Sequence, residues 1–205
     1  MLERIQNTLK NIQITRDGGW LADGQRHIDF LKDMIELYTS KSGFSSGQRR
    51  YISFLEERYT DEYIQEEVQW RESYNDDLRE IAVRCAHYYN AQTPIYYSFT
   101  VSKVLGAPTT HVLSKKEFHK MCMNKYADKV LQEYKTDARY KVGDLVTPRA
   151  NSSHKHKGHG LILAANFQPI TRACKGSKPY KVKFLKSNKV EIVHEKEIKS
   201  IRRKK

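Results

Sequence analysis

Apolar residues recur at helical spacing over much of the first 136 residues. In residues 26–38, Ile28, Leu31 and Ile35 stand three or four positions apart, with charged residues between them. Side chains at this spacing lie on one face of an α-helix, because the helix completes a turn every ~3.6 residues. The segment therefore predicts an amphipathic helix whose apolar face packs against other helices.

Capping residues indicate where further helices begin. A Ser or Thr whose hydroxyl accepts a backbone hydrogen bond, followed three residues later by Glu or Gln, forms a capping box, and proline favours the first helical position. The segment after Thr93–Pro94 is rich in aromatic and β-branched residues, so a strand is the alternative there. The capping boxes Ser45–Gln48 and Ser114–Glu117 predict two helix starts, the second for one helix that runs to Tyr134. Thr60 is the predicted cap of one long helix that runs to Asn90, and Thr93–Pro94 is the predicted start of another helix.

After residue 136 the pattern changes to the alternation that is typical of strands. Lys181 and Lys183 alternate with Val182 and Phe184, which places lysines on one face of a strand and apolar residues on the other. Lys189 and Val190 continue this pattern in the next strand. Runs of strand character occupy residues 140–148, 160–167, 179–185 and 189–193, and residues 195–201 suit a last short strand or helix.

These two patterns predict an α+β chain with two domains. An N-terminal α-helical bundle over residues 1–136 is followed by a small antiparallel SH3-like β-barrel over residues 137–205. Without a run of about 18 apolar residues, the chain is not expected to span a membrane. Three cysteines without a CxxC motif favour a reducing cytoplasm, that of the host if the protein is viral.

The positive charge is confined to the predicted barrel. The formal net charge is +13. Residues 1–136 carry 19 basic and 19 acidic side chains, whereas residues 137–205 carry 18 basic and 5 acidic ones. Such asymmetry predicts contact with a polyanion, since a charge that serves solubility would be spread along the chain. A solvated lysine-rich surface is the other interpretation.

The basic segment supplies candidate contacts to phosphates. Lysine and arginine side chains in loops, on a strand face and in the final tail can bind a nucleic-acid backbone without reading its bases. Tyr180 or Phe167 can add base stacking, although at least one of them is expected to pack in the core. The predicted nucleic-acid-binding residues are Arg149, Lys155, Lys157, Arg172, Lys175, Lys178, Lys181, Lys183, Lys186, Arg202 and Arg203.

The strand segments resemble the Tudor- and KOW-type small barrels. In those folds a Gly-Asp-x-Val strand opens the barrel, a glycine precedes the second strand, and an aromatic-x-Val-x-Phe strand follows. The matching positions are Gly143–Asp144, Gly160 and Tyr180–Leu185, within residues 140–201. The resemblance implies a small barrel that binds RNA, DNA, a modified peptide or another protein, so it does not select the ligand. A methyl-lysine cage is not evident, because the segment has few aromatic residues.

The helical part resembles small accessory proteins encoded by tailed phages. The resemblance is carried by a glutamine-led helix after the GFSSGQ segment (residues 43–48) and by NKYADKV (residues 124–130) before the barrel. It implies no particular activity.

Three histidines in the predicted barrel have spacing that merits a test for metal binding. His154, His156 and His159 form an H-x-H-x-x-H pattern, and Cys174 follows fifteen residues later. These side chains could supply the four ligands of zinc. The interleaved lysines would repel a dication, however. We predict no metal and no other cofactor, and a cationic loop to which imidazoles add charge below about pH 6.5.

Signals for catalysis are few. Glu197 and Lys199 form an E-x-K triplet like that of some metal-dependent nucleases, with Asp144 as a distant carboxylate, but such a triplet is expected by chance in a chain with 37 basic residues. The glycine-containing segment 17–24 lacks the lysine of a phosphate-binding loop. We predict that the protein is not an enzyme.

Two functional hypotheses follow. The first is a non-enzymatic, largely sequence-nonspecific nucleic-acid-binding accessory protein in replication or transcription, whose barrel binds DNA or RNA and whose helical domain binds a protein. The alternative is an interaction adaptor whose basic barrel docks on an acidic surface of a host or viral machine. Residues 1–80 carry 11 basic and 16 acidic side chains, and this polarity between the chain ends suits a bridge between a protein and its template.

Overall fold

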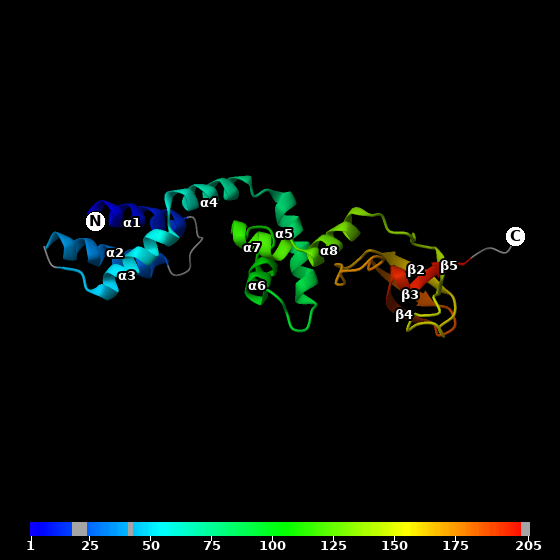
Figure 1. Ribbon diagram of the computed structural model, residues 1–205. Helices are drawn as coiled ribbons and strands as arrows, with labels where there is room; N and C mark the ends of the chain where they lie inside the picture. Colours follow the sequence, from blue (N-terminus) through cyan, green and yellow to red (C-terminus); the bar gives the residue numbers. More distant parts are fainter. Residues whose placement is uncertain (18–23, 41–42, 202–205) are drawn as a thin grey trace. The chain divides into compact units, whose positions relative to one another are not determined.

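The computed structural model describes residues 1–17, 24–40 and 43–201 (Figure 1). The chain divides into two compact units, Met1–Tyr74 and Asn75–Lys205. The change from helices to strands, which the sequence places at residue 136, falls inside the second unit. In the described residues, no helix combines the length and the apolar character that crossing a bilayer requires.

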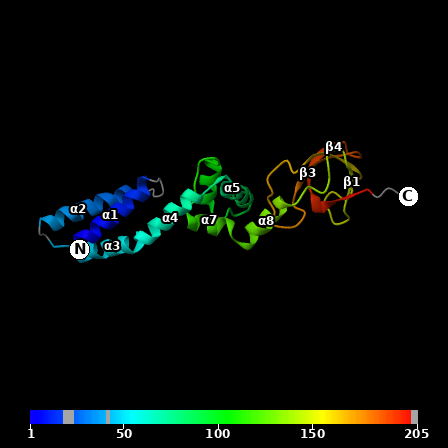
Figure 2. The same ribbon diagram turned by 90° about the horizontal axis from the view of Figure 1, so that it is seen from above.

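The first unit is helical. Its helices are α1 (Leu2–Asp17), α2 (Gly24–Thr39), α3 (Ser46–Arg58) and α4 (Asp61–Ser73). Helices α1 and α2 lie side by side in both views (Figures 1 and 2). The predicted apolar stripe is confirmed, because Ile28 and Leu31 of α2 are fully buried and Ile35 packs beside them. The capping box of Ser45 and Gln48 and the Thr60 cap are also confirmed.

The second unit begins with four helices, where three predicted helix limits are wrong. Its helices are α5 (Asp76–Asn90), α6 (Ser98–Gly106), α7 (Lys115–Cys122) and α8 (Lys125–Lys135). The predicted long helix ends at Ser73, and the Asn75 side chain caps a new one by accepting from Leu78 N. Asn124 likewise divides the helix predicted after Ser114, whose capping box is confirmed. Helix α6 begins after Tyr97, and Thr93–Pro94 lies before it with a cis peptide bond.

The C-terminal part of the second unit is a five-stranded antiparallel sheet. Its strands are β1 (Leu145–Pro148), β2 (Gly160–Ala165), β3 (Pro179–Phe184), β4 (Lys189–His194) and β5 (Ile198–Ser200), with a 3-10 turn at Glu195–Glu197. Their order is β4-β3-β2-β1-β5. Strands β4 and β5 are the two edges, so the sheet is not closed, whereas the sequence predicted a small SH3-like β-barrel.

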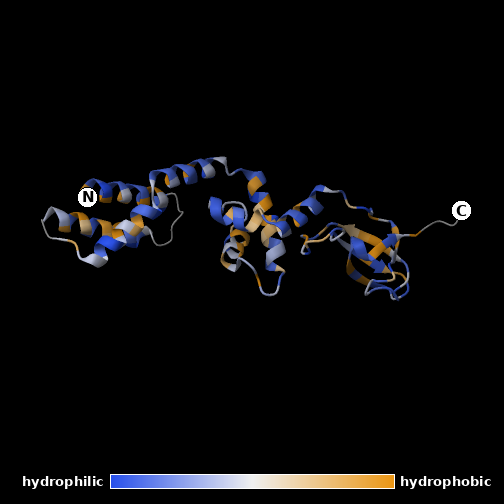
Figure 3. Cartoon of the chain, in the orientation of Figure 1, coloured by the Kyte–Doolittle hydropathy of each residue, from blue (hydrophilic) through white to orange (hydrophobic). Residues whose placement is uncertain are grey.

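The sheet buries one face in its own core. In β3, Val182 and Phe184 are fully buried and Lys181 is exposed, which confirms the predicted alternation. Figure 3 shows that the strands of the sheet carry both hydrophobic and hydrophilic residues. In β4 the predicted inward residue is wrong. Val190 is 46% exposed because it pairs with the outward-facing Lys183, and another valine of the strand is buried instead. The core consists of Tyr140, Val146, Ile162, Tyr180, Val182, Phe184, Val193 and Ile198.

Helix α8 is joined to the loop before β3 by buried polar contacts. The Glu133 carboxylate accepts hydrogen bonds from the backbone N–H groups of Gly176 and Ser177, at 2.9 and 3.3 Å. The Tyr134 hydroxyl accepts from the N–H of Ile170 at 2.9 Å. These contacts make α8 part of the same compact unit as the sheet.

Candidate nucleic-acid interface

The acidic side chains of the sheet region are used internally. Asp144 and Glu197 each accept a backbone hydrogen bond at 2.8 Å, from the N–H groups of Lys141 and His194. Glu195 accepts at 2.8 Å from a buried tyrosine hydroxyl in β3. These hydrogen bonds hold the carboxylates in place but do not remove their negative charge. The sheet region is strongly positive because residues 137–205 carry 18 basic and only 5 acidic side chains.

The histidine-containing loop after β1 is held to β4 by Glu191. The carboxylate of Glu191 pairs with the ammonium of Lys157, and the ring of His154 lies 3.0 Å from it. The ammonium lowers the pKa of Glu191 below its ordinary value. His154 also stacks on Phe184, with ring centroids 5.9 Å apart. Within the described ranges no three His, Cys, Asp or Glu side chains form a cluster suited to a metal.

Two predicted contact residues lie on the outer face of the sheet among apolar side chains. Lys181 pairs with Ile192 and Lys183 with Val190. Ile192 is 49% exposed and Val190 46% exposed. The predicted lysine face is therefore a mixed face of ammonium and aliphatic groups.

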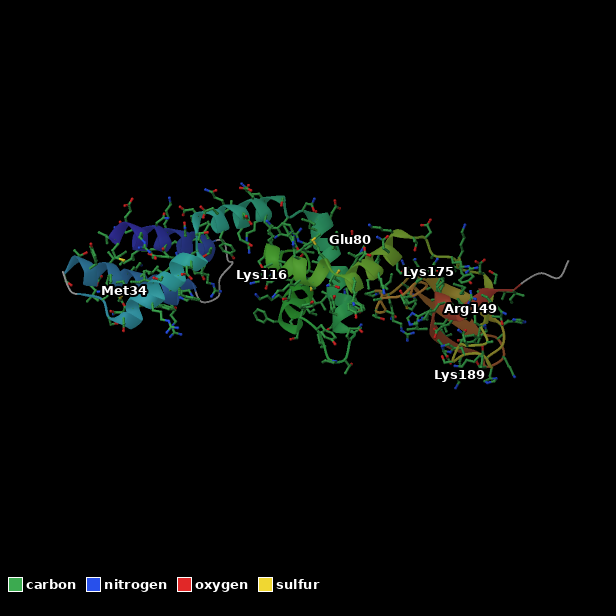
Figure 4. The ribbon with its side chains drawn as sticks, viewed as in Figure 1. Met34, Glu80, Lys116, Arg149, Lys175 and Lys189 are labelled. Carbon is green, nitrogen blue, oxygen red and sulfur yellow. The ribbon has the colours of Figure 1, made fainter. Side chains whose placement is uncertain are left out.

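The remaining predicted residues have different surroundings. Lys178 is an exception among the loop cations because it is only 1% exposed, and its ammonium lies beside Thr136 Oγ1 and 3.8 Å from the Glu133 carboxylate. It is a buried ion-pair partner rather than a surface contact. Arg202 and Arg203 lie outside the described residues. Lys155, Arg172, Lys175 and Lys186 are exposed in loops, and Figure 4 shows Arg149, Lys175 and Lys189 at separate places around the sheet.

A cationic pocket of about 620 Å³ lies where β1 pairs with β5. The pairing of Thr147 with Lys199 brings the two strands' side chains together. Arg149 follows β1, and its Nε donates to the carbonyl of Ile198 at 3.0 Å. This hydrogen bond anchors the guanidinium group to β5. The described lining contains no acidic residue and consists of Arg139, Thr147, Arg149, Lys199, Ser200 and Ile201.

Sequence reasoning found only one of the three cations of this pocket. Arg149 was predicted as a phosphate contact, whereas Arg139 lies before the first strand and Lys199 was considered only in the E-x-K triplet. The glutamate of that triplet accepts a backbone hydrogen bond instead of lining the pocket. A pairing between strands about fifty residues apart brings the three cations together, and no local motif encodes it.

The chain is thus an α+β protein with a pocket lined by cations at one edge of a small antiparallel sheet. Comparisons of the chain with models of protein families, with curated proteins and with solved structures find no match.

The surroundings of His194 predict that the stability of the folded protein depends on pH. Burial lowers the pKa of His194 below its ordinary value, the nearby Arg172 and Lys196 lower it further, and a hydrogen bond to the Ser177 carbonyl at 2.9 Å opposes them. The unfolded chain therefore takes up this proton more readily, so stability decreases as the pH falls below about 6.5. We expect His194→Gln to reduce this decrease between pH 7.5 and 5.5 in thermal unfolding. An identical pH dependence in both proteins would contradict this assignment.

Proposed function

We propose that the sheet region binds the phosphate backbone of nucleic acid without catalysis and with little sequence preference. The observation that carries this proposal is the pocket, which is lined by three cations together with Thr147 and Ser200. Guanidinium, ammonium and hydroxyl groups are donors to phosphate oxygens, and arginine binds them in a bidentate manner. The described lining offers no carboxylate to compete for these donors.

The exposed loop cations extend this surface beyond the pocket. Lys155, Arg172, Lys175 and Lys186 are exposed, and they offer long side chains that adapt to a flexible polyanion. Contacts of this type supply affinity but carry no base information, so discrimination between sequences is expected to be weak. The position of β5 beside β1, after a 3-10 turn, supports a relation of the open sheet to SH3-like folds.

The test is a double substitution, Arg139→Gln with Lys199→Gln, in the full-length chain. Both side chains are exposed, and Arg149 is left unchanged because its Nε also stabilises β5. Fluorescence anisotropy with labelled duplex DNA, single-stranded DNA and RNA is measured at several salt concentrations. If each cation contacts one phosphate, the negative slope of log affinity against log salt concentration becomes less steep by roughly 2.

The matched control removes the same two residue types from the first unit. Arg26→Gln with Lys32→Gln takes two exposed cations from α2 and is expected to leave the salt slope unchanged. Equal effects of the two double variants on the salt slope would mean that the pocket contributes only through the overall positive charge of the protein. No binding of any nucleic acid at low salt would refute the proposal.

The full-length chain is required because cutting at residue 136 would separate a buried ion pair. Glu133 would remain on the helical fragment, and Lys178 would keep its buried ammonium without this carboxylate. A fragment of residues 137–205 is therefore expected to be destabilised for reasons unrelated to ligand binding.

One observation favours the adaptor as a second candidate function. The outer face of the sheet exposes Leu145, Val190 and Ile192 beside its lysines, with 51%, 46% and 49% of these apolar residues accessible. A protein surface with carboxylates around an apolar centre would match this face better than a phosphate backbone does. Val190→Ser with Ile192→Ser would separate the two functions, since it should weaken docking on a protein and leave nucleic-acid binding intact.

A further inference from the structure

A pocket lined by tyrosines lies in the helical part of the second unit. Its volume is about 490 Å³, and it is lined by Tyr88 and Tyr89 of α5, by Tyr96 and Tyr97 before α6, and by Tyr126 with Lys125 of α8. Tyr96, Tyr97 and Tyr126 are 57%, 41% and 48% exposed. Three large rings that remain accessible at one pocket are more than the packing of the helices requires.

The backbone of Tyr97 supports a built site. Its φ is 55° and its ψ 34°, in the left-handed region that bulky residues rarely adopt. This conformation sets the Tyr97 ring edge-on against Tyr89, with centroids 5.0 Å apart and planes at 89°. Strained residues of this kind concentrate at functional sites.

The chemistry of the lining disfavours a cationic ligand. No acidic residue lines the described pocket, and the Lys125 ammonium lies 5.1 Å from the centre of the Tyr126 ring. Lys125 is also in the first turn of α8, where the helix dipole is positive. Burial raises the pKa of Tyr89 to about 12 and also raises that of Tyr88, so neither hydroxyl supplies negative charge near neutral pH. The suitable ligand has a flat apolar face and carries negative charge.

The pocket is connected to the basic sheet region. Gln92 lines the pocket, and its side-chain amide donates to the carbonyl of Thr171 at 3.1 Å. The next residue is the exposed Arg172, in the loop that joins β2 to β3. A chain of phosphates with bases attached could therefore contact the tyrosine pocket and the loop of Arg172 at the same time, because both belong to the second unit.

We infer that the tyrosine pocket is a stacking site for an unpaired base of single-stranded nucleic acid, with Lys125 contacting the adjacent phosphate. Base stacking on aromatic side chains tolerates any sequence, because every base has a π-face. A base within a duplex is already stacked and does not enter. The inference rests on the proposed function of the sheet region and adds a preference for single strands.

The test compares three labelled ligands of equal length with the full-length protein: an oligothymidylate, an abasic strand, and a duplex. The parent protein should bind the oligothymidylate more tightly than the abasic strand. Tyr96→Ala with Tyr126→Ala should weaken oligothymidylate binding roughly 5- to 100-fold. Binding of the abasic strand and the duplex should not change.

Two variants serve as controls. Tyr96→Phe with Tyr126→Phe keeps the rings and should retain the preference for the base-bearing strand. Tyr63→Ala removes a tyrosine of similar exposure, 44%, from the first unit and should have no effect. Because the two substituted pocket tyrosines are half exposed, the Ala variant should keep its fold, which circular dichroism verifies.

The outcomes separate this inference from the proposed function. Equal affinity of the parent protein for base-bearing and abasic strands would overturn the stacking site alone, provided that Arg139→Gln with Lys199→Gln still lowers duplex binding. A second outcome would be that the oligothymidylate binds in a tyrosine-dependent manner, that the duplex does not bind, and that Arg139→Gln with Lys199→Gln has no effect. This outcome would retain the stacking site and overturn the proposed function of the sheet region. Tyrosine-dependent binding of a proline-rich peptide, with oligothymidylate binding unchanged in the Ala variant, would assign the pocket to a peptide.

Discussion

Glu133→Ala should lower the free energy of unfolding by about 3–5 kcal/mol, the cost of leaving a buried charge without its partner. The ammonium of Lys178 is 3.8 Å from the Glu133 carboxylate and is shielded from water. The substitution also removes the acceptor for the N–H groups of Gly176 and Ser177. Guanidinium unfolding followed by circular dichroism measures the loss, and faster amide exchange at Gly176 and Ser177 would place it at this contact.

The charge and the hydrogen bonds can be separated with further variants. Glu133→Gln keeps an acceptor oxygen but loses the charge, so its effect should be smaller than that of Glu133→Ala. Adding Lys178→Met to Glu133→Gln removes both charges and should recover part of the stability, because well-packed apolar residues often replace a buried ion pair without loss. Gln132→Ala, at an exposed neighbour on α8, is the control and should remain within about 0.5 kcal/mol of the parent. A similar value for Glu133→Ala would show that Lys178 reaches water.

Gly160→Ala is expected to destabilise the sheet by about 1–3 kcal/mol through overpacking. An added Cβ would lie 2.4 Å from Val182 Cγ1 and 3.2 Å from Phe184 Cδ1. Both side chains are fully buried, so neither can move away without disturbing the core. The measurement is again guanidinium unfolding, at a protein concentration low enough to exclude association.

Gly106→Ala is the matched control for this prediction. Apart from its chain neighbours and the backbone of its own helix, no atom lies within 4 Å of the position that its Cβ would occupy. Gly106 is at the end of α6, where alanine has the better helical propensity. We expect it to be neutral or slightly stabilising. Equal stability of the two alanine variants would mean that the strands adjust to the methyl group at Gly160.

The two proposed sites use different chemistry for one class of ligand. The pocket between β1 and β5 offers charge and hydroxyl groups to phosphates. The tyrosine pocket offers ring faces to bases. Duplexes would use the first site and single strands both, so the comparison of ligands carries more information than the affinity for any one of them.

Several features were predictable because they depend on local interactions. A capping box uses residues three positions apart, so Ser45 with Gln48 and Ser114 with Glu117 correctly marked two helix starts. Helix interruptions were missed where an asparagine side chain caps a new helix directly after the preceding one has ended, as Asn75 and Asn124 do. The tyrosine pairs at 88–89 and 96–97 were a local signal for the tyrosine pocket, but the first pair also fits the core stripe of a helix.

The sequence by itself determined the α+β class, the strand segments and the position of the charge, because hydrophobic period and net charge are properties of consecutive residues. Only the tertiary structure decided which cations meet and which are buried. The pairing of β1 with β5 brings Arg139, Arg149 and Lys199 to one pocket, and the docking of α8 removes Lys178 from the surface. The same packing gathers tyrosines from α5, from the segment before α6 and from α8. Lysines look alike in a sequence, and it is non-local packing that makes one a buried partner and another a surface contact.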